Sequence, residues 1–158
     1  MSDDRHRLVR VVLEDQHAAY RTPDAEHERT VAIYDLLHSN RFVLVGGPPG
    51  PFTLHLSIVE SRVVFDLRAK DGVAVAKSGV PLVTIRRVMK DYFRVCDSYV
   101  QAIRTLSRPQ IEAIDVGRRS LHDEGSQILR ERLAGWAEID HDTGRRLFTL
   151  LCAMHSRG

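Results

Sequence analysis

The spacing of apolar residues changes abruptly near residue 84, and this change constrains the fold more than any other feature of the chain. Before it, apolar and polar residues alternate through two runs that contain Phe52, Leu54, Leu56, Phe65 and Leu67. A period of two matches a β-strand, whose successive side chains point to opposite faces. We therefore expect these five residues to face one core.

Two turn signals divide this alternating region into strands. Glu60-Ser61 lies between the two runs, and Asp71-Gly72 follows the second run. Asp-Gly is a strong hairpin signal because Gly readily accepts a positive φ. Residues 73–75 would return as a third strand, so the sequence predicts a small antiparallel β-meander with one buried face.

After residue 84 the apolar residues recur at helical spacing as far as the C-terminus. We expect Thr84 to be the N-cap of a first helix, and the capping box Ser107-Arg108-Pro109-Gln110 to start a second. Asp140 or Asp142 would cap a third. The expected apolar face of the first helix comprises Ile85, Val88, Met89, Tyr92, Cys96, Tyr99, Ile103 and Leu106, and that of the third Leu147, Phe148, Leu151 and Met154.

Two further elements precede the meander. Residues 8–13 are rich in β-branched side chains and predict a strand. Residues 24–40 predict a helix with Val31, Tyr34 and Leu37 on its apolar face. The expected fold class is α+β, with a small antiparallel β-meander packed against one early helix and a C-terminal three-helix half. A chain of 158 residues is expected to form a single globular domain over residues 1–158.

Composition excludes several classes of protein. The chain is 43% hydrophobic and 28% charged, which is typical of a globular protein and excludes disorder. No apolar run approaches the roughly 20 residues of a membrane-spanning helix. Residues 1–7 lack the apolar segment of a secretory signal. We therefore expect a cytoplasmic protein with no membrane partner.

Residues 115–126 form the richest polar cluster. On a helix, Asp115, Arg119, His122 and Ser126 share one face. Arg118 falls on the apolar stripe between its neighbours at 114 and 121, and a buried guanidinium needs a matching acid or a ligand anion. The acids expected to match Arg118 are Asp35, Asp66, Asp91 and Glu124.

Gly117 and Gly125 interrupt this helical pattern. Each costs roughly 1 kcal/mol relative to Ala in a helix, so a close approach of another element would explain them. A break at Gly125 is the rival explanation. We expect a broken or kinked helix over residues 108–136 rather than a smooth one.

A stripe of basic residues follows the preceding helix. Arg86, Arg87, Lys90 and Arg94 recur at three-to-four spacing, and the region 83–119 carries a net charge of +4. Across the whole chain, 20 Arg stand against 3 Lys, and Arg is well suited to bidentate contacts with carboxylate and phosphate. The stripe is either a solvated helix face or a surface that follows phosphates.

No spacing typical of a metal site, a phosphate loop or a nucleophile elbow occurs in the sequence. His122 and Ser126 lie one turn apart but lack an oxyanion hole. We therefore predict no catalytic residue, no metal and no cofactor.

Several short segments from Glu26 to the C-terminus form a specific combination. They are Glu26-His27-Glu28-Arg29 with Ala32-Ile33-Tyr34-Asp35, Lys90-Asp91-Tyr92-Phe93, residues 110–115, Gly117-Arg118-Arg119, Leu121-His122 with Glu124-Gly125-Ser126, and residues 145–149. In this combination the chain resembles the bacterial uncharacterised protein family 0262. The resemblance implies a cytoplasmic bacterial protein and carries no assigned activity.

Three functional hypotheses follow. The first is a non-enzymatic interaction or regulatory protein, monomeric or homodimeric, that recognises an acidic or phosphate-bearing protein or nucleic-acid partner through Arg-rich helices. The second is an RNA- or nucleotide-binding protein that uses the basic stripe at 86, 87, 90 and 94. The third is a small enzyme centred on Arg118, Arg119 and His122.

Overall fold

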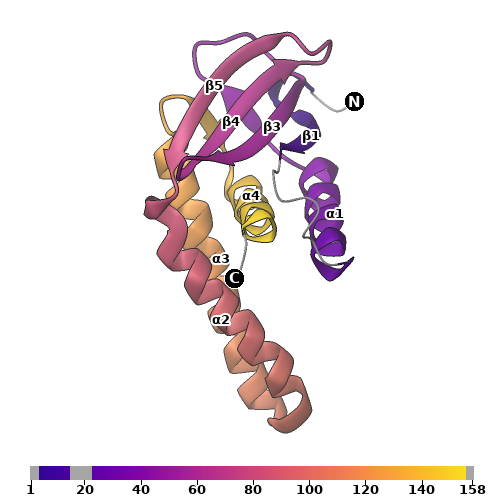
Figure 1. Cartoon of the computed structure of the whole chain (residues 1–158), viewed down its shortest axis with the longest axis vertical. Helices are drawn as coiled ribbons and strands as arrows, with labels where there is room; N and C mark the ends of the chain where they lie inside the picture. The colour runs from indigo at the N-terminus through magenta and orange to yellow at the C-terminus, as the bar shows by residue number, and fades with distance from the viewer. Residues whose placement is uncertain (1–3, 15–22, 156–158) are drawn as a thin grey trace.

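The computed structural model describes residues 4–14 and 23–155, and its class is α+β as predicted. Four helices pack below a mixed sheet, and two of them extend beyond the rest of the molecule (Figure 1). The elements are η1 (Asp4–His6), β1 (Leu8–Glu14), α1 (Pro23–His38), β2 (Phe42–Leu44), β3 (Phe52–Val59), β4 (Arg62–Ala69), β5 (Ala74–Pro81), α2 (Val83–Thr105), α3 (Arg108–Leu133), β6 (Ala137–Ile139) and α4 (His141–Met154).

The antiparallel meander is confirmed as β3-β4-β5, with the turns at the two predicted places. Glu60 and Ser61 have positive φ angles of 50° and 65°, and Gly72 has a φ of 92°. In the register, Leu54 lies opposite Leu67 and Leu56 opposite Phe65. All five residues expected on one face are buried, so the period-two pattern identified the core face correctly.

The first strand extends this sheet in the parallel direction. β1 pairs with β3, which gives the order β1-β3-β4-β5. A second sheet, absent from the predictions, joins β2 to β6 in antiparallel pairing. Strands of three residues are too short to establish an apolar period. Tertiary contacts instead bury this pair, because the ring of Phe42 packs edge-on against Phe52 and Trp136.

Helix α1 forms where predicted, but the predicted apolar face is wrong for Val31 and Tyr34, while Leu37 packs against the core. Tyr34 is 68% exposed and Val31 is exposed as well, whereas Ala32 and Leu36 are buried. The buried face is displaced because α1 packs against α4 and β1. The buried residues of α1 include Arg29, which donates from Nε and Nη2 to the carbonyls of Ala153 and Met154, both at 3.2 Å.

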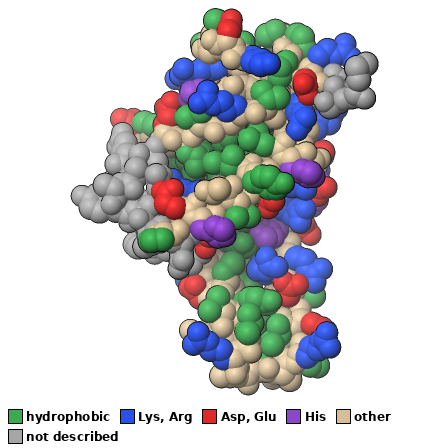
Figure 2. Space-filling view, turned by 90° about the vertical axis from the view of Figure 1, so that its right-hand side faces the viewer, with side chains coloured by type: hydrophobic (Ala, Val, Ile, Leu, Met, Phe, Trp, Pro, Cys, Tyr) green, Lys and Arg blue, Asp and Glu red, His purple; other side chains and the backbone are tan. Residues whose placement is uncertain are grey.

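Helices α2 and α3 form a long antiparallel hairpin. The capping box that separates them is confirmed, with Gln110 Oε1 accepting from the Ser107 amide at 3.0 Å. The N-cap prediction for Thr84 is wrong, because α2 begins at Val83 and Thr84 Oγ1 donates to the Pro81 carbonyl. Ile103 and Leu106, expected to be buried, are exposed near the far end of the hairpin. Green apolar side chains are visible there in Figure 2, where neither the sheet nor α4 covers them.

Helix α3 is continuous from Arg108 to Leu133, so the expectation of a broken helix is wrong. The close-approach explanation holds for Gly125, where a Cβ would overlap the ring of Phe148 on α4. Gly144 makes the reciprocal contact, because a Cβ there would overlap Ser126 Oγ. Gly117 faces open space, so no packing reason applies to it.

No helix in the described ranges 4–14 and 23–155 is both long enough and apolar enough to cross a membrane.

The two glycines of α3 provide a matched pair of substitutions. Gly125→Ala should destabilise the protein, because overlap with the Phe148 ring costs about 1–3 kcal/mol or more and exceeds the gain in helix propensity. Gly117→Ala should stabilise it by about 0.5–1 kcal/mol, because the new methyl group meets nothing. Urea unfolding of both variants measures these changes. Equal stabilisation by both would contradict the close approach of α3 and α4.

Candidate functional site

A polar cavity of about 400 Å³ lies where the four helices meet. Its volume lies in the range of small-molecule sites. Each helix contributes at least one lining residue, so the cavity is built from segments far apart in the sequence. The lining residues are Ala32 and Asp35 of α1, Tyr92 of α2, Arg118 and His122 of α3, and Arg145, Arg146 and Thr149 of α4.

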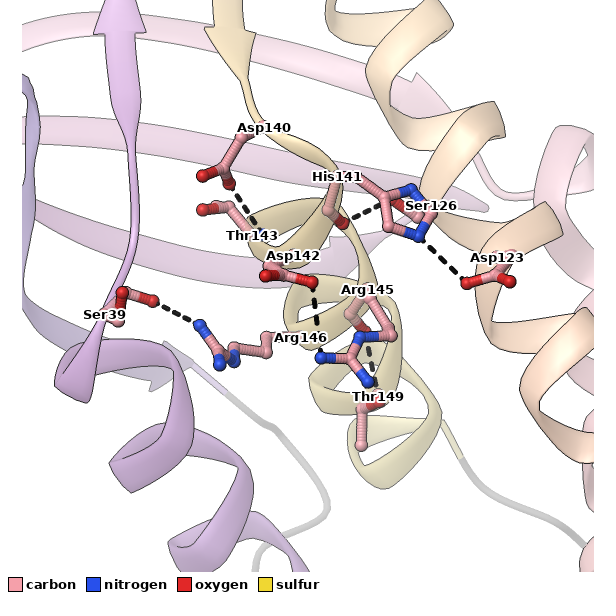
Figure 3. A network of polar contacts seen from close by, with 10 residues as sticks. All are labelled: Ser39, Asp123, Ser126, Asp140, His141, Asp142, Thr143, Arg145, Arg146 and Thr149. Atoms are coloured by element: carbon pink, nitrogen blue, oxygen red, sulfur yellow. Dashed lines mark hydrogen bonds and ion pairs between the residues drawn. The ribbon is translucent and has the colours of Figure 1, made fainter. Parts of the chain in front are cut away.

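The start of α4 is fixed in place by a network of polar contacts (Figure 3). Asp140 caps the helix by accepting from the Thr143 amide at 2.9 Å. Of the two predicted alternatives, Asp140 and Asp142, the first is therefore the cap. Ser126 Oγ donates to the His141 carbonyl at 2.7 Å, and the His141 ring contacts Asp123 at 2.9 Å. Together with the two close glycine contacts, this network holds α4 against the α3 face that carries the cavity residues.

His122 is the most deeply buried polar group of the cavity, with only 8% of its surface exposed. Its ring lies 4.7 Å from the ring of Tyr92 and 6.2 Å from that of Phe148. Burial first, and then the nearby charges of Arg118 and Arg145, lower the pKa of His122 to about 4. The imidazole is therefore neutral at pH 7. Its Nε2 atom is buried and has no hydrogen-bond partner in the described part of the chain.

Arg118 is matched internally, but by a different acid from those predicted. Its Nη2 lies 2.6 Å from Asp115 Oδ1, one turn earlier on the same helix. Arg119 approaches the other oxygen of Asp115 at 2.8 Å, and the two arginines hold the pKa of that carboxyl below its usual value. The Arg118 guanidinium also lies 5.9 Å from the centre of the Tyr99 ring. It stays partly exposed and lines the cavity.

None of the four acids expected to match Arg118 pairs with it among the described residues. Asp66 pairs with Arg68 on the sheet, while Asp91 and Glu124 both pair with Arg87. Asp35 lines the cavity.

Two arginines of α4 complete the positive wall of the cavity. Arg146 extends toward Ser39, just after α1, and donates from Nη1 to its carbonyl at 2.6 Å (Figure 3). Arg145 reaches Asp142 only at 3.4 Å, and its Nε is buried and has no partner within residues 4–14 and 23–155. The cavity thus collects three guanidinium groups, one exposed carboxylate at Asp35 and one neutral imidazole.

The other predicted site residues lie outside this cavity. Ser126 is buried between α3 and α4, and Arg119 remains mostly exposed beside Asp115. In the basic stripe, Arg87 pairs with Asp91 and Glu124, and Arg94 lies 3.6 Å from Asp91. Arg86 and Lys90 lie on the side of α2 near His155, whose pKa burial and these two charges lower.

Sequence reasoning identified Arg118 and His122 but missed Arg145, Arg146 and Tyr92 as site residues. Arg118 was singled out because it falls on an apolar helix stripe. The same argument applies to Arg145 and Arg146, which directly precede the buried Leu147 and Phe148. A charged residue at the edge of an apolar helix stripe needs an acid, a carbonyl or a ligand.

Comparison with known proteins gives a family but no activity. A family model described as Uncharacterised protein family (UPF0262) matches residues 5–157. A "UPF0262 protein" of Nitrobacter winogradskyi is 51% identical over 156 residues, which cover 99% of this chain and 93% of that protein. A "UPF0262 protein" of Rhodopseudomonas palustris strain HaA2 is also 51% identical over 156 residues, covering 99% and 96% respectively. No solved structure matches the chain.

The buried imidazole predicts a specific dependence of stability on pH. Because the pKa of His122 is about 4 in the folded chain and about 6.5 when unfolded, only the unfolded state takes up this proton between those values. Stability should therefore fall as the pH drops from 6.5 to 4, by on the order of 3 kcal/mol from this group. His122→Gln should show a shallower loss across that window in urea unfolding at a series of pH values. Parallel curves for wild type and variant would contradict the neutral buried imidazole.

Proposed function

The chain belongs to the Uncharacterised protein family (UPF0262), and we propose that it is a non-enzymatic interaction or regulatory protein that binds a carboxylate or phosphate group in the four-helix cavity. One observation carries this proposal. Two buried nitrogen atoms without partners in the described residues, His122 Nε2 and Arg145 Nε, belong to side chains that line the same cavity. Buried polar atoms are nearly always hydrogen-bonded, so a pair of such atoms at one cavity indicates a bound polar group: an acceptor for Arg145 Nε–H, and for His122 an acceptor when the proton is on Nε2.

The charges around the cavity favour an anion as that acceptor. Among the lining residues, Arg118, Arg145 and Arg146 outnumber the single carboxylate of Asp35, while outside the lining Asp115 pairs with Arg118 and Asp142 lies 3.4 Å from Arg145. A guanidinium matches the geometry of carboxylate and phosphate oxygens, and hydrogen bonds to ionised acceptors are roughly twice as strong as neutral ones. The neutral His122 can donate one further hydrogen bond from whichever ring nitrogen carries the proton.

Binding is favoured over catalysis by the state of the hydroxyl and imidazole groups. Ser126 Oγ donates to the His141 carbonyl, and Thr149 Oγ1 donates to the Arg145 carbonyl, so both hydroxyl protons are held by the backbone. A general base works best when its pKa lies near the working pH, whereas that of His122 is about 4. These features support a recognition site rather than the enzyme hypothesis.

The cavity is also favoured over the basic stripe of α2 as the anion site. Arg87 and Arg94 already face Asp91, and Arg87 also faces Glu124. Acids therefore pair with arginines at both places, and the cavity is favoured because it also holds two buried nitrogen atoms without partners in the described residues, His122 Nε2 and Arg145 Nε.

Anion-dependent stabilisation tests the proposal. A ligand that binds only the native state stabilises it by RT ln(1 + [L]/Kd), which is about 1.4 kcal/mol at ten times Kd. We expect inorganic phosphate at ten times its Kd to raise the free energy of unfolding of the wild type by this amount. Urea unfolding at constant ionic strength, set with NaCl, measures the change. An identical unfolding midpoint with phosphate and with NaCl would mean that the cavity binds no such anion.

Charge-matched variants locate the site. Arg145→Gln and Arg118→Gln should each lose most of the phosphate effect. Arg86→Gln and Lys90→Gln remove the same charge from outside the cavity and should retain it. Loss of the effect in the second pair alone would place anion binding on the α2 stripe and support the nucleic-acid hypothesis instead.

A further inference from the structure

A second, more apolar cavity of about 430 Å³ adjoins the first. The two cavities share Ala32, Asp35, Tyr92 and Thr149 as lining residues, so they lie side by side. The second part is bounded by α1, α2 and α4 and is lined by apolar side chains that include Val31, Phe93, Val100, Cys152 and Ala153. Arginine side chains line only the first part.

We propose that the ligand is a small amphiphile, an anion that carries an aliphatic or aromatic chain. This inference rests on the proposed function and specifies its ligand. The anionic group occupies the cavity of Arg118, Arg145 and His122, and the chain follows the second cavity along α1 and α2. Because the two cavities adjoin at four shared residues, a ligand whose hydrocarbon chain passes these residues contacts both.

The apolar side chains of the second cavity are open to a ligand. Val31 is 42% exposed and Val100 is 61% exposed, although both are β-branched aliphatic residues on helices that bury other faces. A hydrocarbon chain laid against them removes apolar surface from water, which stabilises the complex in proportion to the area covered. The volumes of both parts suit a small molecule rather than a folded partner.

Charge sets the direction of the ligand across the two cavities. The exposed acids Glu28 and Asp97 line the second cavity, whereas the arginines line the first. An anionic group is repelled in the second cavity and attracted in the first. The chain therefore points away from α3 and toward the region between Val31 and Val100.

A chain-length series tests the proposal, with inorganic phosphate, butyl phosphate and hexyl phosphate as probes below their micelle concentrations. Each buried methylene is worth about a fourfold gain in affinity. Hexyl phosphate should therefore bind about tenfold or more tightly than butyl phosphate in isothermal titration calorimetry. Arg145→Gln should weaken the binding of both esters, because each presents its phosphate to the same arginines.

Two pairs of valines with matched exposed fractions show where the hydrocarbon chain of the ligand binds. Val31→Thr with Val100→Thr keeps the shape of the second cavity but makes it polar, and should weaken hexyl phosphate about fivefold or more while leaving inorganic phosphate unchanged. The control is Val59→Thr with Val116→Thr, at 45% and 60% exposure and outside both cavities, which should leave hexyl phosphate binding unchanged.

The outcomes separate the two proposals. Phosphate binding that depends on Arg145, with no gain from chain length, would overturn the amphiphile and leave the proposed function intact. If hexyl phosphate still binds more tightly than butyl phosphate in the Val31→Thr, Val100→Thr variant, the hydrocarbon chain binds elsewhere and the amphiphile proposal is also overturned. Failure of all three probes to bind would overturn both proposals.

Discussion

The close approach of α3 and α4 is the contact on which the rest of the helical half depends. It requires Gly125 beneath the Phe148 ring and Gly144 beneath Ser126, so each helix lacks a side chain where the other is nearest. Through it, α4 sits among the other helices with Leu147, Phe148 and Leu151 fully buried. The same approach brings the polar edge of α3, with Arg118 and His122, to the polar edge of α4, with Arg145 and Arg146. The same packing of α3 against α4 therefore builds the core and brings the cavity residues together.

Local signals in the sequence were sufficient for most elements of the fold. The alternation through Phe65 and Leu67 specified a buried strand face because only one register places all such residues together. The capping box at Ser107 marked a helix start through contacts within four residues. Two of the errors involve contacts between distant parts of the chain. The buried face of α1 reflects its packing against α4, and Gly125 is explained by the close approach of Phe148 rather than by a helix break.

The site was only half predictable for the same reason. Arg118 and His122 belong to one helix, so their shared location follows from a spacing of four residues. Arg145 lies 23 residues after His122, on a helix that packs back on α3, and no periodicity in the sequence specifies that pairing. The misassigned partner of Arg118 has the opposite cause, because Asp115 lies one turn away on the same helix, whereas the prediction looked for an acid across a tertiary contact.

The parallel pairing of β1 with β3 bears on the order in which the chain assembles. Leu8 and Phe52 lie side by side in the sheet but 44 residues apart in the chain, with α1 and β2 between them. Closing such a loop costs more entropy than closing the tight turns at Glu60-Ser61 and Asp71-Gly72, so the meander and the α2–α3 hairpin form from nearby residues first. The N-terminal strand then joins an edge that already exists, and its arrival covers the exposed backbone groups of β3, which would otherwise offer a template for pairing between molecules during synthesis.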